Sequence, residues 1–155
     1  MTVHAHELVM TLDRRIEASP ADVFADWTVP TRLQWYLNPS HASSATVPIT
    51  VDLTVGGAWC VPMVIDSDTA YMTGGVYREI VPGRLLRFAW GARPGWPDPS
   101  EEREGLVTLN DDDGATALHF ALTWISRAGD DTSIWPQCVA GWTDTIDRLV
   151  ARYES

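Results

Sequence analysis

The sequence predicts an α+β fold in which a curved antiparallel sheet of about seven strands wraps around a long C-terminal α-helix. Strand-like alternation fills the chain from Thr46 to Trp124, and one apolar stripe with helical spacing follows it. Glycine pairs interrupt the strand pattern at Gly56-Gly57 and Gly74-Gly75. Such pairs mark bulges and bends where a sheet curves. A sheet bent in this way needs a partner in its concavity, and the final helix is the candidate.

One strand and two short helices precede this region. Residues 7–17 alternate between apolar and polar side chains, which predicts the first strand. Ser19 then precedes a proline and an early acid, the pattern of a serine-capped helix with proline in its first turn. Pro30 is expected to end that helix. Thr31 is expected to cap a second short helix, which stops at Asn38.

Six further strands are predicted as three hairpins. Their ranges are 46–54 with 58–65, 70–81 with 85–91, and 104–110 with 115–124. The third hairpin turns at Asp111-Asp112-Asp113-Gly114, a strong turn sequence. The segment from Ala92 to Arg103 contains three prolines and is predicted to be a long loop, a kind of segment that often forms a lid.

The final helix is predicted to start near Ser133. Its apolar stripe consists of Trp135, Val139, Trp142, Ile146, Leu149 and Tyr153. Gly141 lies inside this helix, where glycine costs about 1 kcal/mol relative to alanine. Two explanations remain open for it: close packing against a strand, or contact between a ligand and the helix backbone.

Composition excludes several classes of function. The length of 155 residues predicts one domain covering residues 1–155. A net charge of −10 argues against partners such as nucleic acid or an anionic membrane surface. The chain contains no lysine, which excludes a lysine Schiff base and lysine-dependent phosphate loops. Without a dinucleotide motif or a metal-ligand set, no cofactor and no metal site are predicted.

The expected location is the cytoplasm. The N-terminal residues lack a basic segment followed by an apolar core, so no signal peptide is predicted. No apolar run approaches the roughly 18 residues of a membrane span. The two cysteines, Cys60 and Cys138, do not form a secreted disulfide framework and are interpreted as small buried thiols.

Four segments carry a family resemblance: residues 18–24 with Trp35, 55–59, 75–85 and 141–149. In this order they resemble the START and birch-pollen-allergen (SRPBCC) superfamily, which has the helix-grip fold. Within it, the sequence is most similar to bacterial homologues of the activator of the ninety-kilodalton heat-shock protein ATPase. One departure is Trp35-Tyr36, where the family commonly has two tryptophans. The superfamily includes lipid carriers, hormone receptors, cyclases and co-chaperones, so the resemblance implies the fold more than the function.

The leading hypothesis is a START-like protein that binds a small, flat, hydrophobic and aromatic molecule between the sheet and the final helix. The predicted wall residues are Trp59, Met63, Phe88, Trp90, Phe120, Trp135, Val139 and Trp142. The alternative is a cyclase- or lyase-type enzyme acting on a polyketide-like or aromatic substrate by acid–base catalysis in the same cavity. Its candidate catalysts are His41, Tyr77, Arg78 and Glu79. The third hypothesis is a co-chaperone or stress-response module, and a homodimer is left open.

The charged residues of the 70–81 strand test the enzyme hypothesis. Arg78 and Glu79 are expected on alternate faces, so one of them points into the concavity unless a bulge at Gly74-Gly75 shifts the register. Arg87 on the adjacent strand is the expected ion-pair partner. His119 is expected on the opposite side of its strand from the apolar residues and is interpreted as an ordinary strand histidine.

Overall fold

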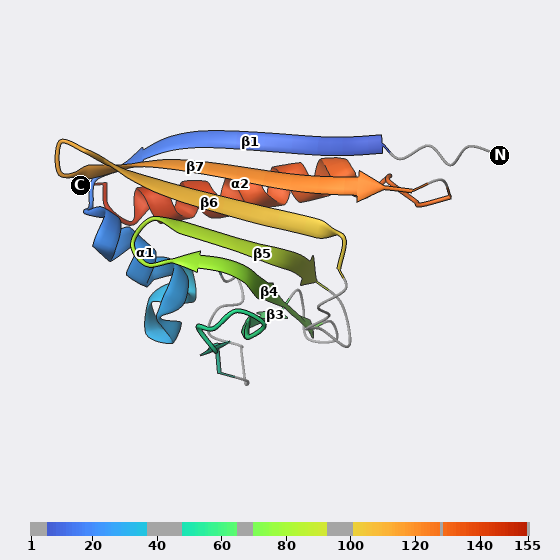
Figure 1. Cartoon of the computed structure of the whole chain (residues 1–155), viewed down its shortest axis with the longest axis horizontal. Helices are drawn as coiled ribbons and strands as arrows, with labels where there is room; N and C mark the ends of the chain where they lie inside the picture. The colour runs from blue at the N-terminus through green and yellow to red at the C-terminus, as the bar shows by residue number, and fades with distance from the viewer. Residues whose placement is uncertain (1–5, 37–47, 65–69, 93–100, 128, 155) are drawn as a thin grey trace.

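The computed structural model describes residues 6–36, 48–64, 70–92, 101–127 and 129–154 (Figure 1). The elements in chain order are β1 (His6–Ile16), α1 (Pro20–Thr28), the 3-10 helix η1 (Pro30–Tyr36), β2 (Thr50–Val51), β3 (Ala58–Val64), β4 (Ala70–Val81), β5 (Leu85–Ala92), β6 (Arg103–Asp112), β7 (Ala115–Ser126) and α2 (Trp135–Ala151). The predicted α+β fold is confirmed.

The described strands form one seven-stranded sheet in the order β1-β7-β6-β5-β4-β3-β2. All neighbours pair antiparallel, which confirms the three predicted hairpins. The strand predicted over 46–54 ends at Val51, because a turn follows in which the N–H of Gly57 donates to the carbonyl of Thr54. Residues 46 and 47 lie outside the described residues. Arg103, predicted in a loop, begins β6 because it pairs with Trp124.

The first turn of α1 matches its predicted cap: the Ser19 hydroxyl accepts a hydrogen bond from the N–H of Asp22. The second short helix differs from the prediction. It is a 3-10 helix and includes Pro30 rather than starting after it, since the N–H of Arg32 already donates to the carbonyl of Val29.

Helix α2 lies against the concave face of the sheet, behind β6 and β7 in the view of Figure 1. Trp142, Ile146 and Leu149 from its predicted stripe are buried, with exposed fractions of 2% or less. The stripe therefore covers the inner residues of the sheet, as the spacing predicts.

An aromatic cluster fills the space between sheet and helix. Trp142 stacks on Phe120 at 4.5 Å between ring centroids and on Trp27 at 6.2 Å. Phe88 lies 6.3 Å from Trp142 and 5.4 Å from Trp59. These rings are almost completely buried, so they form packed core rather than an open wall.

Two glycines on the inner face make room for this cluster. A Cβ on Gly105 would lie 2.6 Å from the Phe88 ring. A Cβ on Gly75 would lie 2.4 Å from the Trp59 indole nitrogen and 2.7 Å from the Phe88 ring. Both rings thus lie directly on the sheet backbone at positions where only glycine fits.

A buried carboxylate joins α1 and η1 to the end of α2. Asp26 is fully buried and accepts from Arg32 at 2.9 Å, with Arg152 at 3.4 Å. The Tyr153 hydroxyl also donates to Asp26. Arg148 of α2 donates to the carbonyl of Trp35 at 3.0 Å, which ties η1 to the helix.

Substituting Gly105→Ala is expected to destabilise the fold by about 1–3 kcal/mol, because the new methyl group overlaps a packed ring. Gly141→Ala is the control, since its Cβ would meet nothing within 4 Å and alanine favours helix. Urea unfolding measures both. Equal stability changes of the same sign would contradict this explanation of Gly105.

Asp26→Asn is expected to lower the free energy of unfolding by about 2–4 kcal/mol. The change leaves two arginines without their buried counter-charge, a loss moderated because both arginines are about one-third exposed. Asp22→Asn, an exposed acid on the same helix, serves as the control and should change stability by less than about 1 kcal/mol. Similar losses in both variants would contradict the role of Asp26.

Candidate functional site

A cavity of about 240 Å³ opens beside the aromatic cluster, between η1, the ends of β4, β5 and β6, and the first half of α2. Its lining residues are Tyr36, Thr73, Trp90, Arg103, Ile134, Gln137, Cys138, Gly141, Trp142 and Thr145. Apolar rings and a few polar groups thus converge on one concave site, the usual composition of a small-molecule pocket.

Three aromatic residues form one side of the cavity. The ring of Trp142 lies 5.5 Å from that of Tyr36 and 5.6 Å from that of Trp90, with edge-to-face geometry in both pairs. Each side chain is at least nine-tenths buried, so its rotamer is fixed by packing. The cavity therefore has a rigid aromatic wall.

The polar groups behind this wall bond to one another. The indole N–H of Trp90 donates to the Tyr36 hydroxyl at 2.9 Å, and the Thr73 hydroxyl donates to the carbonyl of Gly91 at 2.9 Å. Because the Thr73 proton is used there, the 3.3 Å contact between the two hydroxyls has Tyr36 as donor. This chain holds Tyr36 and Trp90 in place.

Arg103 supplies the positive charge of the lining. Its guanidinium lies over the Trp90 ring at 4.9 Å and over the Trp124 ring at 5.7 Å. Its Nε donates to Glu101 Oε1 at 2.8 Å, and its Nη1 lies 3.8 Å from the sulfur of Cys138. Both charged side chains are buried, with exposed fractions of 11% and 8%. Arg103 is thus a fixed donor rather than a mobile surface cation.

Gly141 lies on the cavity side of α2. A Cβ there would meet nothing within 4 Å, so the close-packing explanation for this glycine is wrong. The Thr145 hydroxyl donates to the Gly141 carbonyl at 2.6 Å. The helix backbone is therefore open to the cavity at a position where a side chain would reduce its volume.

The predicted wall residues are divided between the cavity and the core. Trp90 and Trp142 line the cavity. Trp59, Phe88 and Phe120 are buried in the aromatic cluster. Trp135 and Val139 are partly buried on α2, with Trp135 packed near Trp124. The side chain of Met63 and the whole of His41 lie outside the described residues.

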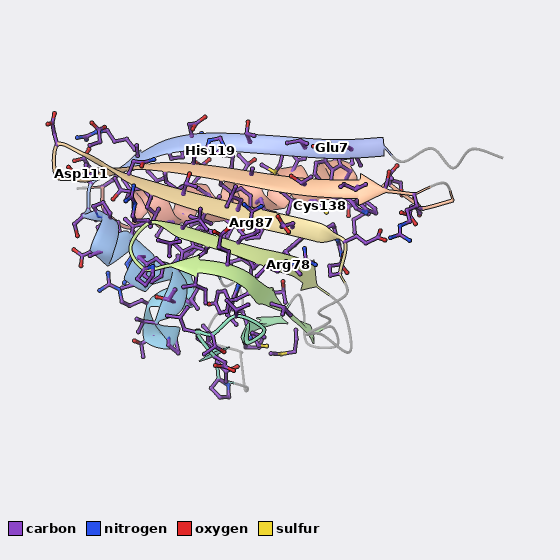
Figure 2. All side chains as sticks on the ribbon, viewed as in Figure 1. Glu7, Arg78, Arg87, Asp111, His119 and Cys138 are labelled. Atoms are coloured by element: carbon purple, nitrogen blue, oxygen red, sulfur yellow. The ribbon has the colours of Figure 1, made fainter. Side chains whose placement is uncertain are left out.

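Neither charged residue of β4 enters the concavity. The register shift falls between Tyr77 and Glu79 instead of at Gly74-Gly75, which leaves Arg78 and Glu79 both exposed. Figure 2 labels Arg78 and Arg87 on the face of the sheet turned away from α2, where both pair with Glu104, and Glu79 pairs with Arg87. The predicted ion pair is confirmed, with Arg87 Nε 3.2 Å from Glu79 Oε1.

Tyr77, the remaining described catalytic candidate, is buried in the core. Its hydroxyl has no hydrogen-bond partner among the described residues, and burial raises the pKa of this phenol. It therefore stays protonated near neutral pH. His119 is half-exposed, as expected of a strand histidine, and pairs with Asp13 at 2.8 Å.

Several lining residues were not predicted from the sequence: Tyr36, Thr73, Arg103 and Thr145. Arg103 was within reach of sequence reasoning. Extending the third hairpin by one pair places it opposite Trp124 on the inner face, an arginine in an otherwise apolar position. The other three give no such signal, because their neighbours come from distant elements.

The family model described as "Activator of Hsp90 ATPase homolog 1-like protein" matches residues 17–154. No curated protein matches the chain. Among solved structures, a Chromobacterium violaceum protein is similar at TM-score 0.71, with 23% identity and coverage of 95% of this chain and 98% of that one.

Two other similar structures have informative names. An AHSA1-like protein from Aeromonas hydrophila has a TM-score of 0.68 and 20% identity over 94% of this chain and 91% of its own. The Aha1 dimer from Colwellia psychrerythraea has a TM-score of 0.64 and 16% identity over 95% of this chain and 96% of its own. At these identities the structures establish the fold alone.

Two negative findings apply to the described part of the chain. None of its helices is long and apolar enough to cross a membrane. Nor does it contain a group of three or more histidine, cysteine or acidic residues arranged to hold a metal ion.

The thiol of Cys138 should reveal the character of the cavity. Burial raises its pKa, an effect that the nearby Arg103 partly offsets. In a Cys60→Ser variant, alkylation by iodoacetamide should therefore require a higher pH in the folded protein than in urea, because the thiolate is the reactive form. Identical pH profiles in the two states would contradict a buried Cys138.

Proposed function

The chain belongs to the Activator of Hsp90 ATPase homolog 1-like protein family, and we propose that it binds a small, flat, hydrophobic aromatic molecule in the cavity beside α2. The observation that carries this proposal is a rigid aromatic wall of Tyr36, Trp90 and Trp142 facing an open helix backbone at Gly141. Preformed apolar concavities with a few polar groups are typical small-molecule sites.

The cavity volume limits the ligand. At about 240 Å³ it lies below the roughly 300–1,000 Å³ of typical ligand pockets. The aromatic cluster occupies the rest of the space between the sheet and α2. A molecule of one or two rings fits this volume, whereas a steroid or a polyketide of several rings does not.

Gly141 gives independent support. A glycine inside a helix costs about 1 kcal/mol relative to alanine, and no packing contact with the described residues requires it at position 141. A ligand that lies against the helix backbone supplies a reason for this cost. This glycine lines the same cavity as the aromatic wall.

The enzyme alternative receives no support from the described residues. Arg78 and Glu79 lie on the opposite face of the sheet, and Tyr77 is buried in the core. Acid–base catalysis needs a group whose pKa lies near the working pH and which reaches the substrate. The described lining offers only hydroxyls, an amide, a buried thiol and an arginine.

A co-chaperone module that acts through its surface is the second candidate. The observation in its favour is the aromatic filling of most of the space under α2, which leaves a modest cavity. This candidate predicts a protein partner and no saturable small-molecule binding at the cavity.

Location and assembly follow as lesser proposals. The two free thiols fit a reducing compartment such as the cytoplasm. The Colwellia protein is a dimer, so pairing of two copies is also proposed for this chain, which sedimentation would test.

The proposal predicts that one- or two-ring aromatic molecules change the tryptophan fluorescence in a saturable way, whereas steroids and fatty acids do not. Gly141→Leu should weaken this binding at least tenfold, because its side chain enters the cavity. The variant should remain folded, since leucine favours helix over glycine.

Ala140→Leu is the matched control, because Ala140 is the exposed neighbouring residue on α2 and does not line the cavity. It should bind as the wild type does. Equal losses in both variants, or no saturable response from any aromatic molecule, would count against the cavity as a binding site and favour the co-chaperone candidate.

A further inference from the structure

We infer that the ligand is uncharged and carries a hydrogen-bond acceptor, such as an amide or ketone carbonyl, which the guanidinium of Arg103 binds. Glu101 then acts as the residue that selects against carboxylates. This inference rests on the proposed binding function and names the chemistry of the molecule bound.

Arg103 is the one charged side chain among the described residues that line the cavity. Its guanidinium lies over two indole rings. Its Nε donates a hydrogen bond to Glu101, and its Nη1 donates to the sulfur of Cys138. None of the described residues accepts a hydrogen bond from its Nη2 group. A planar donor fixed in this way is preorganised to bind a ligand oxygen.

Most donors of the aromatic wall are already used, although the buried indole N–H of Trp142 has no partner among the described residues, and the exposed Gln137 also carries a side-chain amide. The Tyr36 hydroxyl donates to Thr73, and the Thr145 hydroxyl donates to the Gly141 carbonyl. The indole N–H of Trp90 donates to Tyr36. Because its guanidinium is charged, Arg103 is the strongest donor available to a ligand that lies against the aromatic wall.

The charge balance decides between a neutral acceptor and a carboxylate. Glu101 already neutralises Arg103, 2.8 Å away and 8% exposed. A carboxylate ligand would place a second buried negative charge beside one guanidinium, which is unfavourable where water is excluded. The net charge of −10 further disfavours approach of an anion. A neutral acceptor gains the hydrogen bond without this cost.

Three one-ring probes differ in the group attached to the ring: phenylacetamide carries a neutral acceptor, phenylacetate carries a carboxylate, and ethylbenzene carries neither. Tryptophan fluorescence of the wild-type protein at pH 7 should show phenylacetamide binding at least tenfold more tightly than either of the others. Glu101→Gln keeps an acceptor for Arg103 but removes the negative charge, so phenylacetate should become the tightest ligand. The doubly substituted Arg103→Met/Glu101→Gln protein leaves no buried charge unpaired and should bind the amide no better than ethylbenzene.

Glu102→Gln is the matched control. Glu102 is the neighbouring acid and pairs with Arg127, and neither residue lines the cavity. Its substitution changes the net charge of the protein by the same amount as Glu101→Gln. It should keep the wild-type preference.

Saturable binding of all three probes without preference for the amide, or an order of affinity unchanged by Glu101→Gln, overturns this inference and leaves the binding function standing. Failure of every probe to bind wild type overturns both.

Discussion

The structure depends on one steric constraint: two aromatic rings lie directly on the backbone of the sheet. Phe88 and Trp59 take this position because Gly75 and Gly105 present no side chain on the inner face. The helix then packs onto these rings through Trp142, which also stacks on Trp27 from α1. One contact surface thus joins the sheet and both α-helices. Since interiors are packed near crystal density, a single added methyl group at its base disturbs all of these elements.

The cavity is a consequence of where this cluster ends. Rings occupy the middle of the concavity, and the cavity described above lies beside the first half of α2, where Gly141 adds no side chain. Tyr36 reaches this place from η1, which Arg148 and the buried Asp26 tie to the helix. The geometry of the site therefore rests on the same helix contacts that stabilise the fold. A residue far from the cavity, such as Asp26, can affect the site through the position of η1.

Local patterns in the sequence predicted the fold well and the site poorly. Alternation and turn residues predicted the range 70–81 that β4 has in the structure. The apolar stripe predicted α2 and the face of it that is buried. The division of Trp59, Phe88 and Trp90 between core and cavity depends instead on how far the rings fill the concavity, which periodicity does not encode. The face of Arg78 was equally beyond reach, because it depends on a register shift at Tyr77 rather than at the glycine pair.

The pairing of Arg103 with Glu101 also explains how a charged residue is tolerated at the edge of an aromatic core. Burying a lone guanidinium is expensive, but here two indole faces and a carboxylate replace its water. Arginine suits this role because its flat, weakly hydrated group stacks on rings while its edge still donates hydrogen bonds. Replacement of a buried ion pair by apolar residues of similar volume is often neutral or stabilising, so stability alone is a weak reason for such a pair. Its position in the cavity lining, with donor capacity left over, is consistent with the recognition role proposed for it.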